Sequence, residues 1–504
     1  MILALLSALI MILAAPPLNW YLCGWIGLVP LIFYLSKGNS PRSDFLAGYA
    51  FGFVYLGYLF WGVTELSNFA GFWGFVGYLA LVFYYAFFPA LFALLIGQAH
   101  HKRYYILWVA AGWVLMEYLR SLGPFGATLG AVGYLESHFG YFIQIASVGG
   151  VYLLSFLLVL FNAWLAQFLN FKNSRRSGFF ILLILIFVFA YGFFRINFPI
   201  NAIPAGPVGV ETNGTMTKDQ NSEFTVMIVQ PNINQHDKMD GSKSWEILRY
   251  IEKLTLTDKT ASLEAIIWPE TAISEYLFGG SNSYYNELRV FINLLGTGFI
   301  TGAPYWNGKE AYNSAFSFNN SGEVLSRFDK ERLVPFGEYL LFRPIFLPLL
   351  GGDGLFSQDF SFGSSNPDLL KIGRAQAATA ICFESVYPDL VRDRVNLGGD
   401  FILVITNDGW FGASNVAEQH LNIGMIRAVE NGRYLVQCGN TGISGFINPN
   451  GKLIAKTGLG KAQTLIGQIA LLSNRTIYGW VGDWIVWFCG LWILGSVFYL
   501  FKRR

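Results

Sequence analysis

Long apolar segments at both ends of the chain constrain its fold more than any other feature. They occupy residues 1–198 and return after about residue 476, and charged residues make up only 13% of the chain, against about 25% in an average soluble domain. A bilayer core about 30 Å thick is crossed by about 20 apolar helical residues. The apolar pattern therefore predicts eight membrane spans, at residues 2–15, 18–36, 45–64, 72–97, 104–122, 140–169, 178–198 and 480–501.

The first apolar segment has two interpretations. Leu13-Ala14-Ala15 resembles the small-residue cleavage site of a signal peptide. The segment lacks the basic residues that begin such a peptide, and a second apolar segment follows at once. These features favour a membrane hairpin that turns at Pro16-Pro17 over a signal peptide.

Basic residues predict the orientation, because Lys and Arg in short loops stay on the cytoplasmic side of a membrane. Alternate connections carry almost all of them: Lys37 and Arg42, Lys102 and Arg103, Lys172, Arg175 and Arg176, and Lys502, Arg503 and Arg504. We therefore expect both termini in the cytoplasm and the polar middle of the chain outside the cytoplasmic (inner) membrane, which is the periplasm if the source is a Gram-negative bacterium. Glu117 and Glu136 fall at membrane depth, where a carboxylate is costly enough to suggest a function.

Composition divides the chain into four parts. We expect a seven-span membrane domain at residues 1–198, a Pro- and Gly-rich linker at 199–223, an outer domain at 224–472, and a last span with a basic tail at 473–504. In the outer domain, short β-branched runs alternate with helical patterns. Strands are predicted at 225–230, 265–268, 299–303, 377–381, 401–406 and 434–438, helices at 245–256, 284–295 and 416–430, and hairpins at 312–328 and 444–455. This pattern indicates sheets covered by helices.

Several classes of site are disfavoured by the sequence. A net charge of +2 gives no footprint for nucleic acid. The four cysteines are too few and scattered for a disulfide framework, and neither they nor the five histidines have metal-ligand spacing. A disulfide between Cys382 and Cys438 stays possible outside the cytoplasm, but it would remove the most interesting thiol.

Cys382 is the candidate nucleophile, because it ends the predicted strand at 377–381, where a thiol can be exposed for attack. Most cysteines are simply buried in a core, and a thiol with a pKa of about 8.5 needs a base or a nearby cation to react at neutral pH. Glu270 follows the strand-like Ile266-Ile267-Trp268-Pro269, and Lys330 follows a hairpin strand. Alone, each of these two would more often be a surface charge. Together they form a possible catalytic set.

The order Glu270, Lys330, Cys382 resembles the signature of the nitrilase superfamily, whose fold is an αββα sandwich. Over essentially its whole length, the chain is also similar to the bacterial apolipoprotein N-acyltransferases, a membrane family with a nitrilase-like domain inserted before the last of eight spans. The matching motifs are Trp268-Pro269-Glu270, Leu333-Val334-Pro335-Phe336-Gly337-Glu338, Ile381-Cys382-Phe383-Glu384, Asn407-Asp408-Gly409-Trp410-Phe411-Gly412 and Asn440-Thr441-Gly442-Ile443-Ser444.

The resemblance implies a role for each matching residue. Glu270 would be the general base, Cys382 the nucleophile and Lys330 the cation that stabilises the oxyanion. Glu338 and Glu384 would orient Lys330 and the thiol. Asn313 and Arg343 fall where relatives have substrate-binding residues.

Two apolar features suggest a route for lipid. A mobile lid could be formed by the aromatic pair Trp410-Phe411 and by the apolar, glycine-containing stretch at residues 345–356. The alternative is that both are ordinary core packing. The chain also departs from the family: Phe383 stands where relatives often have Tyr, and Met239 where Trp is frequent.

The resemblance implies a two-step acyltransferase. Cys382 would take an acyl chain from a phospholipid as a thioester, and the amine of a diacylglyceryl-modified cysteine on an apolipoprotein would then accept it, without a cofactor. A membrane-bound nitrilase-like amidase, in which water resolves the thioester, is the alternative enzyme. A transporter or scaffold with a decayed outer domain is the alternative outside enzymology, and the intact Glu270, Lys330 and Cys382 argue against it.

Overall fold

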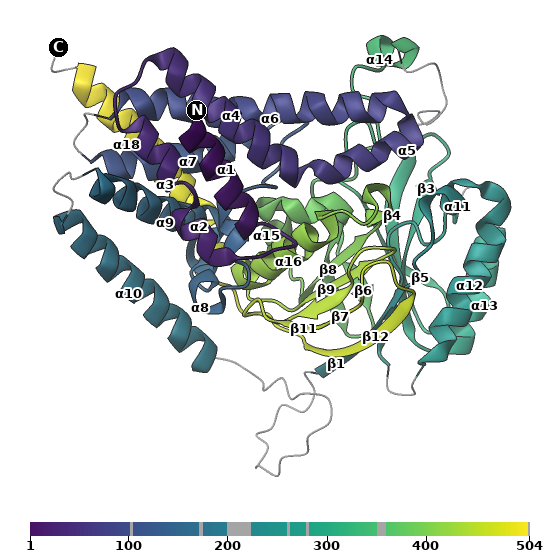
Figure 1. The fold of residues 1–504 in the computed structure, drawn as a ribbon. Helices are drawn as coiled ribbons and strands as arrows, with labels where there is room; N and C mark the ends of the chain where they lie inside the picture. Colours follow the sequence, from purple (N-terminus) through teal and green to yellow (C-terminus); the bar gives the residue numbers. More distant parts are fainter. Residues whose placement is uncertain are drawn as a thin grey trace. The chain divides into compact units, whose positions relative to one another are not determined.

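A computed structural model describes residues 1–100, 104–170, 175–198, 223–259, 263–278, 282–349 and 359–501. The chain forms two compact units, and Figure 1 shows the helices and strands of each. The helical unit comprises Met1–Phe198, Ala413–Glu430 and Thr476–Arg504. The sheet unit comprises Pro199–Gly412 and Asn431–Arg475. The predicted linker at 199–223 lies almost entirely outside the described residues.

The helical unit contains the apolar segments. Its elements are α1 (Ile2–Ala14), η1 (Tyr21–Cys23), α2 (Gly24–Gly27), α3 (Val29–Leu35), α4 (Pro41–Leu59), η2 (Trp61–Leu66), α5 (Ser67–Ala70), α6 (Phe72–Gln98), α7 (Tyr105–Arg120), η3 (Val132–Glu136), α8 (Gly140–Ile143), α9 (Ala146–Leu169), α10 (Arg175–Asn197), α16 (Val416–Asn431), α17 (Ile477–Val481) and α18 (Trp484–Phe501).

Several of these helices suit a membrane. Within the described residues, α6, α9 and α10 are each long and apolar enough to cross one, and α4 with the helical stretch after it, bent by 61°, makes a possible fourth span. Shorter apolar helices cover Ile2–Ala14, Tyr21–Leu35 and Trp484–Ser496. A multi-pass helical membrane domain is thus confirmed, whereas the count of eight spans stays a prediction. The orientation of the termini stays a prediction as well, because the helices are identified as spans by length and composition alone.

The predicted span at residues 18–36 is not one helix. It breaks between α2 and α3 because the side chain of Asn162 replaces helical hydrogen bonds there. The Asn162 Oδ1 accepts from the backbone N–H of Leu28 at 3.0 Å, and its Nδ2 donates to the carbonyl of Gly24 at 3.0 Å. Pro30, near the start of α3, has no N–H to donate.

The predicted span at 140–169 is broken as well. After the short helix α8, α9 kinks where Gly149 and Gly150 leave helical geometry, with Gly150 at a φ of 68° that favours glycine. The released N–H of Val151 donates to Glu430 Oε1 on α16 at 2.8 Å. Glu430 also pairs with Arg427, and both side chains are fully buried. The segment Ala413–Glu430 therefore supplies buried polar groups to the helical unit.

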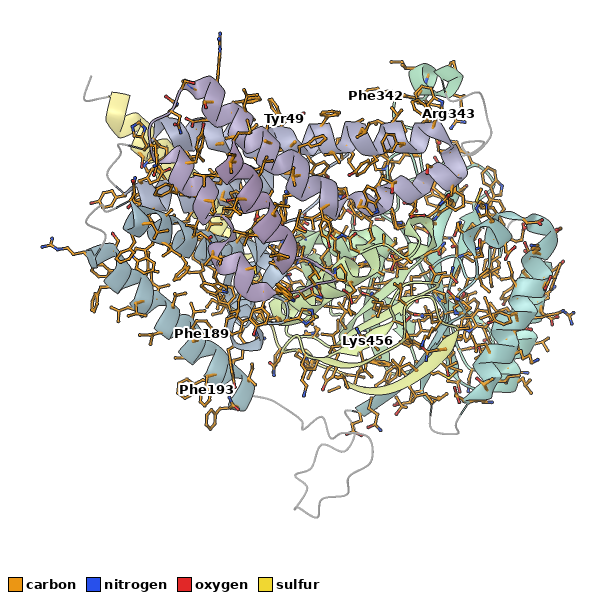
Figure 2. All side chains as sticks on the ribbon, in the orientation of Figure 1. Tyr49, Phe189, Phe193, Phe342, Arg343 and Lys456 are labelled. Atoms are coloured by element: carbon orange, nitrogen blue, oxygen red, sulfur yellow. The ribbon has the colours of Figure 1, made fainter. Side chains whose placement is uncertain are left out.

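Lipid-facing and central helices differ in their burial. The apolar window of α9 is 78% buried, whereas that of α10 is 17% buried. Figure 2 shows Phe189 and Phe193 along α10, and Phe193 is 47% exposed. Because a large apolar face on a soluble surface would be unfavourable, α10 has the character of a helix that faces lipid.

The sheet unit contains two six-stranded sheets. The first has the order β12-β1-β2-β3-β4-β5 and the second β11-β10-β9-β8-β7-β6. The strands are β1 (Glu223–Gln230), β2 (Ala265–Ile267), β3 (Gly298–Trp306), β4 (Ala311–Phe318), β5 (Val324–Asp329), β6 (Leu370–Ile372), β7 (Ala375–Ile381), β8 (Phe401–Thr406), β9 (Leu435–Gly439), β10 (Gly445–Ile447), β11 (Leu453–Lys456) and β12 (Gln463–Ala470).

Helices cover the outer faces of these sheets. The helical elements of the sheet unit are α11 (Gln235–Met239), η4 (Gly241–Lys243), α12 (Ser244–Thr257), α13 (Ser283–Leu295), α14 (Arg343–Leu349), η5 (Cys382–Val386), α15 (Pro388–Asn396) and η6 (Asp408–Phe411), of which α12, α13 and α15 pack against the sheets. One apolar core, including Ile228, Ile267 and Leu403, fills the space between the sheets. A second core joins α12 and α13 to the first sheet (Figure 1), and α15 contacts β7 and β8. The predicted αββα sandwich is confirmed.

Close packing of α4 against α6 yields a prediction. A Cβ at Gly48 would lie 2.4 Å from the carbonyl oxygen of Pro89, so the two backbones would have to separate. We expect Gly48→Ala to lower the free energy of unfolding by about 1–3 kcal/mol, measured as a lower thermal midpoint in detergent. Gly77→Ala on α6 is the matched control, because no atom lies within 4 Å of its added Cβ. Equal midpoints for the two variants would contradict this packing.

Candidate active site

The candidate residues are presented where strands of both sheets end. Glu270 lies three residues after β2, Lys330 directly follows β5, and Cys382 directly follows β7. The strands β2 and β5 belong to the first sheet and β7 to the second. The two sheets therefore contribute side chains to one edge of the sandwich.

Lys330 is the centre of a buried polar cluster. Its Nζ lies 3.3 Å from Glu270 Oε1 and 2.9 Å from Glu338 Oε1, and the Lys330 side chain is only 1% exposed. Asn313 on β4 joins the same two carboxylates, because its Nδ2 lies 2.8 Å from Glu270 Oε1 and 2.6 Å from Glu338 Oε1. Burial acts to lower the pKa of Lys330, but Glu270, Glu338 and Cys382 outweigh it and hold that pKa well above its usual range. Lys330 is thus a fixed cation.

Glu270 is held by backbone as well as by side chains. Its Oε2 accepts from the backbone N–H of Asn407, which follows β8 in the second sheet, at 2.9 Å. A Cβ at Gly302 on β3 would lie 2.7 Å from Glu270 Cα and 2.6 Å from the nitrogen of Thr271, so this strand approaches the Glu270 backbone as only glycine allows. The carboxylate is therefore oriented from both sheets.

Cys382 lies on a strained turn beside this cluster. Its φ is 54°, in the left-handed region that residues other than glycine seldom adopt, and strain of this kind is concentrated at functional sites. Burial, and then the nearby Glu270 carboxylate, raise the pKa of the Cys382 thiol well above its usual range, and the Lys330 ammonium only partly offsets them. The thiol is therefore protonated at neutral pH, and a base must remove its proton before it can attack.

Glu384 connects the loops that carry Lys330 and Cys382. Its Oε1 accepts from the backbone N–H groups of Glu331 and Arg332 at 2.8 and 3.1 Å, and its Oε2 accepts from that of Ile381 at 2.8 Å. Arg394 on α15 pairs with Glu384 at 2.9 Å and donates to the carbonyl of Thr379 at 2.7 Å. Glu384 therefore acts on the backbone rather than on the Lys330 ammonium.

The other predicted residues have different surroundings. Arg343, at the start of α14 (Figure 2), pairs with Asp359 at 2.7 Å. Trp410 and Phe411 are partly exposed on η6. Residues 350–356 of the predicted lid lie outside the described residues. No disulfide joins Cys382 to Cys438.

In the helical unit, the two acidic residues now have named partners. Glu117 Oε1 accepts from Trp113 Nε1 at 2.7 Å and from the backbone N–H of Val132 at 2.8 Å. Glu136 Oε2 accepts from Trp25 Nε1 at 2.9 Å. In the part of the chain that the structure describes, no group of three His, Cys, Asp or Glu side chains is placed to hold a metal ion.

Comparison with known proteins places both parts of the chain in one family. The family model "Apolipoprotein N-acyltransferase N-terminal domain" matches residues 7–164, and "Carbon-nitrogen hydrolase" matches 225–476. An apolipoprotein N-acyltransferase from Geobacter metallireducens is 30% identical, over 97% of this chain and 92% of the relative. One from Synechocystis sp. is 28% identical over 97% and 98%, and one from Rickettsia typhi 28% over 90% and 89%.

The chain belongs to the apolipoprotein N-acyltransferase family. It is accordingly an acyltransferase in which a nitrilase-like domain is joined to a helical membrane domain. The resemblance drawn from the sequence motifs is confirmed at the level of family and fold.

Three residues of this acyltransferase site were missed by sequence reasoning. Asn407 lay within a recognised motif, but its contribution is a backbone N–H, which no side-chain pattern reveals. Arg394 appears in the sequence as one of several charges on a short helix. Lys238 on α11 donates to the backbone carbonyl of Glu270 at 3.3 Å, but in the sequence it is only the residue before Met239. Both Arg394 and Lys238 are buried, which distinguishes them from surface charges, but burial of a single charged side chain cannot be recognised from the sequence.

The Arg394–Glu384 pair gives a prediction about the acyltransferase fold. The Arg394 and Glu384 side chains are 2% and 0% exposed, so Arg394→Met would leave a buried carboxylate without its cation. We expect the free energy of unfolding to fall by about 3–5 kcal/mol, measured by thermal or denaturant unfolding in detergent.

The control is Arg392→Met on the same helix. Arg392 pairs with Asp393, whose side chain is 64% exposed, and a surface pair contributes about 0–1 kcal/mol. A loss as large in Arg392→Met as in Arg394→Met would refute the structural role of the buried pair.

Proposed function

We propose that this protein transfers an acyl chain from a phospholipid, through a thioester on Cys382, to the N-terminal amine of a diacylglyceryl-modified apolipoprotein. The observation that supports it most strongly is the buried set in which Lys330 lies between Glu270 and Glu338, beside the Cys382 turn. The family of the chain supports the choice of lipid donor and lipoprotein acceptor.

In the first step, Glu270 takes the proton of the Cys382 thiol as the sulfur attacks the ester carbonyl of the phospholipid. The carbonyl oxygen becomes an oxyanion, and the Lys330 ammonium stabilises it. The intermediate then collapses, the ester C–O bond breaks, and the leaving alkoxide receives the proton from Glu270. The products are the Cys382 thioester and a lysophospholipid.

In the second step, the α-amino group of the acceptor attacks the thioester carbonyl. Glu270 takes a proton from the amine, Lys330 again meets the oxyanion, and the C–S bond breaks. The departing sulfur regains a proton from Glu270, which restores the resting thiol. The acyl chain ends in an amide bond, and no outside energy source is needed because the donor ester supplies the acyl group.

The remaining residues of the site have supporting roles in this proposal. Glu338 and Asn313 fix the Lys330 ammonium and the Glu270 carboxylate, and Glu384 fixes the backbone on both sides of the reaction. Arg343, Trp410 and Phe411 would contact the lipid substrates. We propose residues 1–198 and 473–504 as the membrane part, 199–223 as a linker and 224–472 as a periplasmic catalytic domain, with both termini in the cytoplasm. Within 224–472, the segment Ala413–Glu430 packs in the helical unit.

The acyl-enzyme gives the direct test. After incubation of the purified protein with phospholipid, we expect mass spectrometry to find an acyl mass on the peptide that contains Cys382, with an equal amount of lysophospholipid released. Cys382→Ala is expected to abolish both. Cys438→Ala is the matched control and should keep both, because Cys438 is fully buried and its sulfur lies 3.4 Å from the carbonyl oxygen of Ile267, within the core. An acyl mass on another residue would refute the proposed nucleophile.

The second nucleophile separates a transferase from an amidase-like hydrolase. With a diacylglyceryl lipopeptide present, a transferase yields the N-acyl lipopeptide, whereas a hydrolase releases free fatty acid whether or not the lipopeptide is added. Accumulation of fatty acid alone would contradict the proposed transfer.

Lys330 provides a further quantitative prediction. Lys330→Met removes the cation that meets the oxyanion, and the loss of one such donor typically costs about 3–4 kcal/mol. We expect the rate of Cys382 acylation to fall about 10²- to 10³-fold, measured by quenched time courses. Exposed Lys243, which pairs with Asp237, is the control position. A Lys330→Met protein that acylates at the same rate as Lys243→Met would exclude the role given to Lys330.

A further inference from the structure

A second buried lysine lies beside Glu270 and has no part in the steps above. Lys238 is on α11 and is 7% exposed. Its Nζ donates to Thr271 Oγ1 at 2.9 Å and to the backbone carbonyl of Glu270 at 3.3 Å. Both acceptors are neutral, so these contacts satisfy the ammonium group without neutralising its charge.

A buried ammonium that has only neutral hydrogen-bond partners is energetically unfavourable. Burial lowers the pKa of Lys238 to about 8, and the Glu270 carboxylate is the charge that opposes this change. If only these two hydrogen bonds were needed, a neutral side-chain amide could donate them with a smaller desolvation cost than a charged ammonium.

The charges around Glu270 support a role for this lysine. The buried set contains two carboxyl groups, Glu270 and Glu338, but only one ammonium group, Lys330, in contact with them. Lys238 adds a second positive charge beside this set, near which the buried carboxylate of Asp408 also acts on Cys382.

The short helix α11 reaches Glu270 by two routes. Lys238 binds the backbone carbonyl of Glu270 and the side-chain hydroxyl of Thr271. Three residues earlier, Gln235 accepts from Asn407 Nδ2 at 2.8 Å, and the backbone N–H of Asn407 donates to Glu270 Oε2. Residues three apart lie on one face of a helix. Thr271 has a φ of 45°, so the segment that Lys238 grips is strained and needs such support.

We propose that Lys238 is a positioning residue for the general base, one that holds the strained Glu270-Thr271 segment and keeps the Glu270 carboxylate ionised for proton removal from Cys382. The inference rests on the proposed function, because it assigns the task to Glu270 as the base. Lys238 itself touches neither the thiol nor the reacting carbonyl in this account.

The direction of the pH effect follows from electrostatics. A nearby positive charge lowers the pKa of a carboxyl group, so removing it raises that pKa. Acylation needs ionised Glu270, and its rate falls as the pH drops through the pKa of that group. Loss of the Lys238 charge should therefore move the acid limb of the pH–rate profile to higher pH. The charged and titratable groups around Glu270 are Lys330, Lys238, Cys382 and, through Asn313, Glu338. Asp408, next to the Asn407 whose N–H binds Glu270, adds a further carboxylate that acts on Cys382.

The experiment compares Lys238→Met with Lys238→Arg in the full-length protein in detergent, with phospholipid as the acyl donor and acylation of Cys382 as the readout between pH 4 and pH 9. Lys238→Met keeps the length of the side chain but loses its charge. We expect acylation to be about 10- to 100-fold slower, a smaller loss than the roughly 10²- to 10⁴-fold that removal of the general base itself would cause, and an acid limb shifted upward by about one pH unit. Lys238→Arg keeps the charge and should leave the acid limb in place.

Two controls keep the outcome interpretable. Lys243→Met removes an exposed lysine five residues away and should match the unchanged protein in rate and profile. Thr271→Val deletes only the hydroxyl that accepts from Lys238, retains the branched shape, and should give a smaller loss with a shift in the same direction. If thermal unfolding shows that Lys238→Met is misfolded, Thr271→Val takes its place as the test variant.

The possible results distinguish failure of the Lys238 role from failure of the proposed acyl-transfer function. If the unchanged protein gives no acyl mass on Cys382, the proposed function fails. If it does, but the Lys238 and Thr271 variants that fold show an unmoved acid limb, the positioning role is overturned and Lys238 is only structural. An equal slowing of Lys238→Met and Lys238→Arg with no shift in profile would overturn it as well.

Discussion

The contact of one buried ammonium with two carboxylates is the constraint on which the sheet unit depends. Lys330 follows β5 and Glu270 follows β2, so the pairing requires these strands of the first sheet to end at the same level. The N–H of Asn407 then ties Glu270 to the second sheet. A buried charge without its partner costs several kcal/mol. An error in the pairing of the strands would therefore be penalised by electrostatics as well as by packing.

The same arrangement explains how a cysteine can be both reactive and protected. The thiolate is the form that reacts with oxidants and other thiols. Burial and the adjacent Glu270 carboxylate keep Cys382 protonated at rest, and the positive Lys330 does not reverse this. Reactivity then arises only when a carbonyl is present to accept the sulfur while Glu270 takes the proton. The site thus favours attack on a bound ester over side reactions in solution.

Much of this was accessible from the sequence, for identifiable reasons. Strands such as Phe401–Thr406 are buried along their whole length and read as continuous apolar runs, so they were predicted with nearly their observed bounds. Glu270, Lys330 and Cys382 were found because each follows such a strand within a recognisable motif. Strand β6 and strand β12, whose residues Gln463–Ala470 are only partly buried, gave no such signal. The breaks at Leu28 and Gly150 were missed because the side chains that bind the released backbone groups, Asn162 and Glu430, each lie more than 100 residues away in the chain.

Helix α16 has a consequence for how the chain can be divided. The carbon-nitrogen hydrolase match runs through residues 225–476, yet Ala413–Glu430 belongs to the compact helical unit. Arg427 of that helix contacts Tyr134, and Glu430 binds the N–H that the kink in α9 releases. A fragment cut at the borders of the hydrolase match would carry away these partners and expose a buried ion pair to solvent. The enzyme is therefore a poor candidate for expression as an excised soluble domain, and gene fusions that exchange its two halves would have to keep this helix with the membrane part.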